Sequence, residues 1–174
     1  MDGLNSHLKR LIMKYYQKYK MCANEDKIGK ILWSIALPGF GQILNGQLLK
    51  GALFIILEFL VNIKANINEI IILSFQGNIE SAIKQTNYQW LMFYPCIYMF
   101  AIYDTYRNAK GTIPPFAFLP FFCSAILGTI GVIYSSTFRI WGIQLGPILL
   151  TLICFILGIA IGKAIMLSFN QVYR

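Results

Sequence analysis

Long apolar segments separated by short polar stretches make up most of the chain after residue 30. A transmembrane helix needs about 20 consecutive, predominantly apolar residues. Polar residues interrupt the apolar pattern at 77–88, 104–111 and 135–139. The pattern predicts an all-α polytopic membrane protein with four to five transmembrane helices. Its apolar segments are 48–63, whose helix we expect to continue through Asn66 to Phe75, then 90–103, 116–134 and 141–166.

The first apolar segment, residues 31–44, is too short to cross a bilayer as one helix. Its fourteen residues would rise about 21 Å, whereas the hydrocarbon core is about 30 Å thick. The segment contains helix-breaking residues and ends in a tight Asn-Gly turn. These positions are Pro38, Gly39, Gly41, Asn45 and Gly46. We therefore expect a short helical hairpin broken by Pro and Gly, either a tilted half-span or a re-entrant segment.

Residues 4–20 have the periodicity of an N-terminal amphipathic helix. Apolar positions recur at helical spacing, while the basic residues fall mainly on other faces. The apolar positions are Leu4, Leu8, Leu11, Ile12, Tyr15 and Tyr19. Such a helix lies in the headgroup plane of the lipid bilayer, with its lysines near anionic lipid headgroups. An ordinary helix docked on the rest of the protein is the alternative.

The last two apolar segments are joined by a very short turn at 135–139, and we expect them to form an antiparallel helical hairpin. Small residues recur at i, i+4 in both segments: Ser124 and Gly128 in the first, Gly158 and Gly162 in the second. This spacing allows two membrane helices to approach closely. It predicts helix packing and carries no information about chemistry.

The composition favours a membrane location. Hydrophobic residues make up 57% of the chain and charged residues 13%, against about 25% charged in average soluble domains. Much of the net charge of +8 comes from one end, because seven of the fifteen lysines and arginines precede residue 31. A basic arm ahead of apolar segments is typical of a cytoplasmic flank that faces anionic lipid. We therefore expect no nucleic-acid partner; RNA binding by the arm is the minor alternative.

Two topologies follow, depending on whether residues 31–44 cross the membrane. If they cross, the chain makes five passes. If they re-enter, it makes four, and the N-terminus, residues 104–111 and the C-terminus share the cytoplasmic side. Positive charge concentrates on that side. Beyond the arm, the count favours re-entry by four residues (Arg107, Lys110, Lys163 and Arg174) against three (Lys64, Lys84 and Arg139).

Glu58 and Lys50 are candidate functional residues within the first long span. Glu58 lies inside an apolar segment, where a carboxylate costs about 2.5–3.5 kcal/mol on insertion scales and is usually functional or paired. It is either a proton or cation site or a structural group hydrogen-bonded to Gln42 or Gln47. Lys50 lies two turns earlier, and we expect its ammonium group to reach the membrane interface.

Asp104 and Arg107 are the other two candidate functional residues. They stand three residues apart, share one helix face and are expected to pair with each other. A contact from this segment to the hairpin at 38–47 is the alternative interpretation.

Motifs for catalysis and cofactor binding are missing from the sequence. The single histidine, His7, lies in the amphipathic arm, and there is no GxSxG, HExxH, Walker A or dinucleotide-binding motif. The four cysteines have no CxxC spacing. We expect no catalytic residues, no cofactor and no metal site, and we expect that the protein is not an enzyme.

The run LPGFGQILNGQLLKG at 37–51, followed by AIYDTYRNAK at 101–110, resembles a pattern in small bacterial membrane proteins of the TM2 group. In that group a Pro-Gly-x-Gly-Gln-x-x-Asn-Gly hairpin joins two short membrane helices, and an Asp-x-x-Arg segment ends a third. The matching positions are Pro38, Gly39, Gly41, Gln42, Asn45 and Gly46, with Asp104 and Arg107 downstream. Leu44 replaces the usual aromatic residue. The resemblance covers roughly 31–110 and implies a structural device rather than an activity.

These features predict three parts: a basic membrane-surface arm (1–30), a TM2-like hairpin with a third membrane helix (31–112) and a C-terminal transmembrane hairpin (113–174). We expect a bacterial inner-membrane protein with a cytoplasmic N-terminus. The expected function is a non-enzymatic accessory or scaffold subunit, with a protein partner or a second copy in the membrane. The alternatives are a small transporter or channel subunit that uses Glu58, and an immunity or stress-protection protein.

Overall fold

The computed structural model describes residues 2–172, and the side chains of residues 13, 14, 17 and 21–171. The chain is mostly helical, which confirms the all-α class. Its helices are α1 (Asp2–Ala36), α2 (Phe40–Leu44), α3 (Leu48–Ala65), α4 (Ile67–Phe75), α5 (Ile79–Gln85), α6 (Tyr88–Leu91), α7 (Tyr94–Asn108), α8 (Leu119–Tyr134) and α9 (Gly146–Val172). A short antiparallel strand pair, β1 (Arg139–Ile140) with β2 (Ile143–Gln144), lies between α8 and α9.

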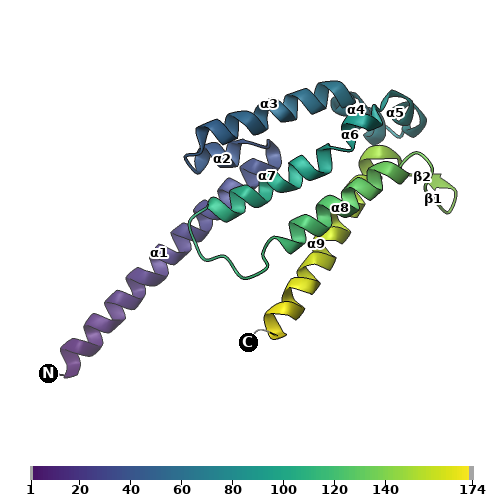
Figure 1. Cartoon of the computed structure of the whole chain (residues 1–174). Coiled ribbons are helices and arrows are strands. Elements are labelled where there is room, and N and C mark those ends of the chain that lie inside the picture. The colour runs from purple at the N-terminus through teal and green to yellow at the C-terminus, as the bar shows by residue number, and fades with distance from the viewer. Residues whose placement is uncertain (1, 173–174) are drawn as a thin grey trace.

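The longer helices after the hairpin run back and forth along one bundle (Figure 1). α3 packs on α7, α7 on α8, and α8 on α9. The short helices α4, α5 and α6 gather with β1 and β2 at one end, at the right of Figure 1. α2, the connection from α7 to α8 and the last turns of α9 lie towards the opposite end. The chain therefore changes ends with each of α3, α7, α8 and α9.

α1 runs without interruption from Asp2 to Ala36, through the boundary expected at residue 30. The helix predicted over residues 4–20 is thus part of a longer one. The positions of its predicted apolar face lie outside the described side chains, so lipid contact by this face stays a prediction. These positions are Leu4, Leu8, Leu11, Ile12, Tyr15 and Tyr19.

The chain turns after α1 at residues 37–39 and again at Asn45 and Gly46, with the five-residue α2 between the two turns. Gly39 has a φ of +107° and packs on α3, where a Cβ would lie 2.5 Å from the Gly51 carbonyl oxygen. Only glycine combines this backbone with this approach. The segment 31–44 is therefore split between the end of α1 and α2, as its Pro and Gly residues predict.

Two expected features around the end of α3 are wrong. The helix predicted to continue through Asn66 to Phe75 ends at Ala65, and α4 begins at Ile67. Asn66 has a left-handed backbone (φ 59°), a conformation that asparagine tolerates better than most residues. The polar stretch 77–88 is not a plain connector, because α5 occupies much of it.

One further prediction needs correction in the second half, and two features there are notable. The polar stretch 104–111 is largely helical because α7 continues to Asn108. Pro95 lies in the first turn of α7, and there its missing N–H costs no helical hydrogen bond. The connection after α8 is longer than predicted: residues 135–145 separate α8 from α9 and include β1 and β2.

α8 and α9 pack against each other through the small residues that the sequence singles out. A Cβ on Gly158 would overlap the Ser124 backbone, and one on Gly128 would overlap the Phe155 ring. Gly162 meets the backbone at the start of α8 equally closely. The Ser124 hydroxyl donates a hydrogen bond to the Phe155 carbonyl oxygen at 3.0 Å. The close approach therefore also pairs a buried polar group.

Apolar side chains cover much of the outside, while several polar side chains are buried. On α3, Leu49 is 91% exposed and Ile63 is 70% exposed, whereas Gln42 of α2 has no exposed area. Within the described residues, one helix is both long and apolar enough to cross a membrane: Gly146–Gln171, with a mean hydropathy of 2.5. α8 is apolar but shorter. The fold thus establishes a helical protein with one candidate membrane-spanning helix, and not the expected four to five spans.

Replacing Gly158 by isoleucine is expected to destabilise the protein, because no side chain fits between α9 and the Ser124 backbone. Overpacking of this kind costs about 1–3 kcal/mol, so the thermal unfolding midpoint in detergent should fall. Ala160→Ile enlarges an exposed position of the same helix and should leave the midpoint unchanged. Equal effects of the two substitutions would contradict the described packing of α8 on α9.

Candidate functional site

The hairpin is attached to α7 through the side chain of Gln42, which is completely buried. Its amide Nε2 donates to the Ala101 carbonyl oxygen at 2.7 Å and to Asp104 Oδ2 at 3.2 Å. Both acceptors belong to α7. Donation to two acceptors fixes the orientation of the amide and leaves Gln42 Oε1 buried without a partner among the described residues. The glutamine of the hairpin motif thus connects α2 to α7.

The Asp104 carboxylate accepts hydrogen bonds from three segments of the chain. Besides Gln42, Lys50 Nζ of α3 lies 2.9 Å from Asp104 Oδ1, and Asn108 Nδ2 lies 3.1 Å from the same oxygen. The ion pair predicted between Asp104 and Arg107 is wrong: Lys50 is the partner, and Arg107 is exposed. The alternative, a contact from this segment to the hairpin, is formed by Gln42. The Lys50 ammonium group points at the Asp104 carboxylate, and its place at a membrane interface stays a prediction.

The two interactions with Asp104 differ in their access to water. The Lys50 side chain is 44% exposed and that of Asp104 is 10% exposed, so water reaches this ion pair mainly from the lysine. The Gln42 amide is buried, and a hydrogen bond to a charged group contributes about 1.5–3 kcal/mol. Both interactions therefore hold the turn between α2 and α3 on α7.

The end of α1 meets the same part of α7 next to Asp104. The Thr105 hydroxyl donates to Ser34 Oγ at 3.1 Å, and Asn45 Nδ2 donates to the Thr105 carbonyl oxygen at 3.0 Å. A Cβ on Gly41 would overlap the Thr105 side chain, so a glycine is needed there. We call the polar residues that join α1, the hairpin, α3 and α7 the hairpin clamp: Ser34, Gln42, Asn45, Lys50, Asp104 and Thr105.

Glu58 lies one turn of α3 beyond the buried Phe54 and is 7% exposed. The Tyr94 hydroxyl of α7 donates to Glu58 Oε1 at 3.1 Å. The hydrogen bond predicted to Gln42 or Gln47 is not formed, since Gln42 bonds α7 instead. Among the described residues, Glu58 Oε2 is buried without a hydrogen-bond partner. One carboxylate oxygen is therefore paired and the other is available to a proton or a cation.

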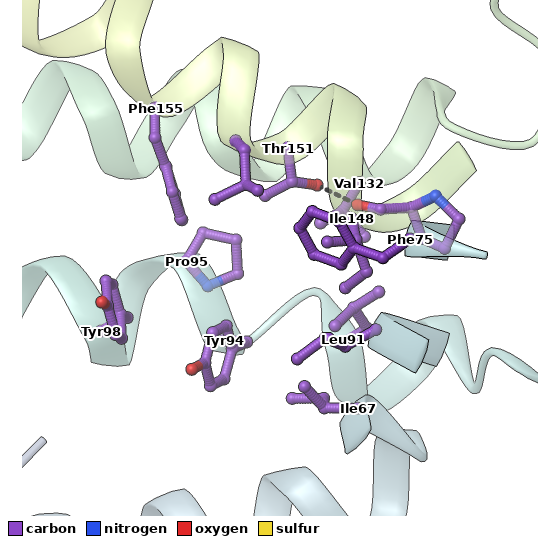
Figure 2. A pocket seen from close by; sticks show the side chains of 13 residues that line it. Ile67, Phe75, Leu91, Tyr94, Pro95, Tyr98, Val132, Ile148, Thr151 and Phe155 are labelled. Carbon is purple, nitrogen blue, oxygen red and sulfur yellow. Dashed lines mark hydrogen bonds between the residues drawn. The ribbon is translucent and has the colours of Figure 1, made fainter. Parts of the chain in front are cut away.

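An aromatic column continues from Tyr94 towards α9. The Tyr94 and Tyr98 rings stack with centroids 5.4 Å apart, and Tyr98 stacks on Phe155 at 6.1 Å. These rings line a cavity of about 190 Å³ between α4, α7 and α9, whose other lining residues are almost all apolar (Figure 2). The Glu58–Tyr94 pair thus lies beside an apolar space rather than a polar path.

Lys27 forms a second polar contact of α1, on the side of the connection from α7 to α8. Its ammonium group lies 3.9 Å from the centre of the Tyr106 ring and 3.4 Å from the Thr112 carbonyl oxygen. Burial lowers the pKa of Lys27, because desolvation disfavours the charged form. A cation over an aromatic face retains favourable electrostatics. Lys27 therefore ties α1 to the end of α7.

Sequence patterns did not indicate four residues that bond Asp104, Glu58 or the rest of the hairpin clamp: Ser34, Tyr94, Thr105 and Asn108. Thr105 directly follows the candidate Asp104, and Asn108 stands four residues after Asp104 on the same helix face, a spacing that the sequence contains. Ser34 and Tyr94 have no such local signal. Among the described side chains, no group of three or more His, Cys, Asp and Glu residues could hold a metal ion. The contacts that these residues make are hydrogen bonds and one ion pair.

No protein-family model, curated protein or solved structure matches this chain. The resemblance to the TM2 group therefore rests on the residues of 31–110 alone.

Gln42→Leu should destabilise the protein by about 1–3 kcal/mol, because it leaves Asp104 Oδ2 and the Ala101 carbonyl without this donor. The measurement is the thermal or urea unfolding midpoint in detergent. Gln47→Leu is the matched control. It removes another glutamine side chain near the same turn, one whose buried Oε1 has no hydrogen-bond partner among the described residues. A control as destabilising as Gln42→Leu would show that the hairpin does not depend on the contact with Asp104.

Proposed function

We propose that this chain is an integral membrane protein of non-enzymatic type with a TM2-like hairpin, which serves as an accessory or scaffold subunit of a membrane assembly. The observation that carries the proposal is the distribution of polarity, with exposed apolar side chains along α3, α8 and α9 and polar side chains inside. In water, exposed apolar area costs about 25 cal/mol per Å². In lipid the same surface is solvated, and polar groups must pair within the protein.

We further propose that α3, α7, α8 and α9 each cross the bilayer and that α2 is re-entrant. α3 and α9, with 18 and 27 residues, rise about 27 and 40 Å, close to or above the hydrocarbon thickness of about 30 Å. α7 and α8, with 15 and 16 residues, rise only about 22 and 24 Å, so each would need its adjoining turns, including α6 ahead of α7, to complete a pass. In Figure 1, α2 and the connection from α7 to α8 lie at one end, which supports a shared cytoplasmic side in a bacterial inner membrane. The basic arm would lie on anionic lipid headgroups there.

A scaffold role is supported by where the polar groups are directed. The hairpin clamp bonds one helix to another, and the cavity beside Glu58 is lined mainly by apolar side chains. The small residues of α8 and α9 are used within the chain, so a partner or a second copy would contact another face. The exposed apolar face of α3 is a candidate surface, with Leu49, Leu53, Ile56 and Ile63 on it.

The proposed topology predicts the positions of four fusion or insertion sites. A reporter after Gly111 and one after the last residue should both be active in the cytoplasm, whereas epitopes inserted at Gly77 and Gly142 should be accessible from the periplasm. Both glycines are exposed with free space around them, so an insertion should be tolerated. The chain should also stay in the membrane fraction after alkaline carbonate extraction. Periplasmic reporters at Gly111 and the C-terminus would overturn the topology, and release by carbonate would overturn the membrane proposal.

A small transporter or channel subunit is the second candidate function, and one observation favours it. Glu58 Oε2 is buried without a hydrogen-bond partner among the described residues. Burying an unpaired charged group is costly unless it takes up a proton or binds a cation. Under this proposal Glu58 is an intramembrane proton or cation site, and Tyr94 orients its carboxyl group.

Glu58→Gln separates the two proposals, because glutamine keeps an acceptor for the Tyr94 hydroxyl and removes the titratable group. For a scaffold, the variant should capture the same crosslinked membrane partner as the wild type, in equal yield. For a transporter, purified wild-type protein in liposomes should pass protons or a cation, and the variant should reduce this flux at least tenfold. Glu69→Gln changes an exposed carboxylate of α4 and should alter neither result. Absence of any crosslinked partner for the wild-type protein would contradict the scaffold role.

A further inference from the structure

The cavity of about 190 Å³ lies between α4, the first turns of α7 and the first turns of α9 (Figure 2). Its wall on α9 extends from Pro147 to Phe155, a rise of about 12 Å. Ile67 and Phe75 of α4 also line the cavity, and Ile67 lies on the side away from Phe155 (Figure 2). The cavity therefore follows α9 for about two turns, and none of the hairpin-clamp residues lines it.

Each hydroxyl group of the lining is already hydrogen-bonded within the chain. Tyr94 donates to Glu58, and Tyr98 donates at 2.7 Å to a carbonyl oxygen in the last turn of α1. Thr151 donates at 2.5 Å to the Pro147 carbonyl oxygen, the bond drawn in Figure 2. The other lining side chains are apolar. A polar ligand would lose its hydration here without finding an unused donor, so the chemistry selects an apolar ligand.

The cavity is continuous with the apolar exterior of α9. Two of its lining residues, Phe75 and Leu152, are 69% and 43% exposed. Leu152 shares one face of α9 with Ile156 and Ile159, which are also exposed. α9 is the helix that is long and apolar enough to cross a membrane. A molecule that contacts α9 from the lipid can therefore reach the cavity without crossing a polar surface.

The size of the cavity fits a short apolar segment. Apolar cavities of about 150 Å³ stay dry and bind benzene, so this one has room for about six carbon atoms.

We propose that the cavity binds the end of one acyl chain of a membrane lipid, held between α4 and α9. The proposal rests on the membrane location argued above. An acyl chain is apolar along its length, is abundant beside α9 in a bilayer, and ends in a segment of the required size. Binding would fill the space beside the Tyr94 and Tyr98 rings. The Tyr94 hydroxyl is the group that bonds the Glu58 carboxyl group.

The test reconstitutes the full chain in liposomes of phosphatidylcholine that carries a photoactivatable diazirine near the end of one acyl chain. After irradiation, the adducts are mapped by mass spectrometry of the digested protein. We expect adducts at Ile71 and Ile148, which line the cavity, at a yield at least fivefold above that at Ile126 and Ile161. The last two are exposed outward on α8 and α9 and serve as references for ordinary lipid contact.

A substitution that fills the cavity should remove the preference. Ile148→Trp should lower the adduct yield at Ile71 at least fivefold. Ile161→Trp, at an exposed position on the side of α9 opposite Leu152, should leave it unchanged. Ile71→Trp provides the reciprocal experiment from the other wall, read out at Ile148, in case Ile148→Trp unfolds. If both variants unfold, the adduct mapping on the wild-type chain still decides the question.

The outcomes distinguish this proposal from the membrane location on which it rests. Adducts confined to the outward references, with none at Ile71 or Ile148, would overturn the acyl-chain site and leave the membrane location intact. A chain without adducts at any position would overturn the membrane location as well. A dimer in which Ile71 and Ile148 gain no lipid adducts would assign the cavity to a second copy and overturn the lipid proposal. In that case Trp141→Ala, a change at a 97% exposed side chain, should break the dimer and restore the adducts.

Discussion

The buried carboxylate of Asp104 is the constraint on which the first half of the structure depends. A carboxylate with little access to water needs donors around it, and α7 itself supplies one, from Asn108. The other donors are Gln42 and Lys50, which lie on either side of the turn between α2 and α3. Satisfying Asp104 therefore places that turn on α7. Gly41 makes the placement possible, because any larger residue would collide with α7.

The C-terminal half is held by close packing rather than by charge. Gly158 and Ser124 let the backbones of α8 and α9 meet, and the Ser124 hydroxyl bonds the facing backbone. In lipid, apolar side chains gain little by moving from acyl chains to a helix interface, so association depends on close contact and on hydrogen bonds between helices. The first half of the chain is joined by hydrogen bonds between helices, and the second half by close contact together with the Ser124 hydrogen bond. The proposed membrane location accounts for that choice, and for an exterior that is largely apolar.

Local patterns in the sequence predicted what depends on neighbouring residues. Proline and glycine at 38–41 predicted the broken hairpin, because their backbone restrictions act wherever the chain lies. The i, i+4 glycines predicted the α8–α9 contact, because that spacing places them on one helix face. The end of α3 was missed, since a single left-handed residue such as Asn66 leaves no pattern that distinguishes it from other asparagines. The resemblance to the TM2 group pointed to the hairpin and to Asp104 but not to the bond between them.

The sequence by itself determined the helical class, the broken hairpin and the small-residue faces, because periodicity and backbone sterics act over a few residues. Only the tertiary structure decided which polar groups meet. Lys50 pairs with Asp104 across 54 positions, and Tyr94 reaches Glu58 across 36, in place of the partners that stood nearer in the sequence. A buried polar group bonds whichever donor the packed helices bring within about 3 Å. Where the helices cross sets that distance, so it cannot be predicted from the spacing of residues along one helix.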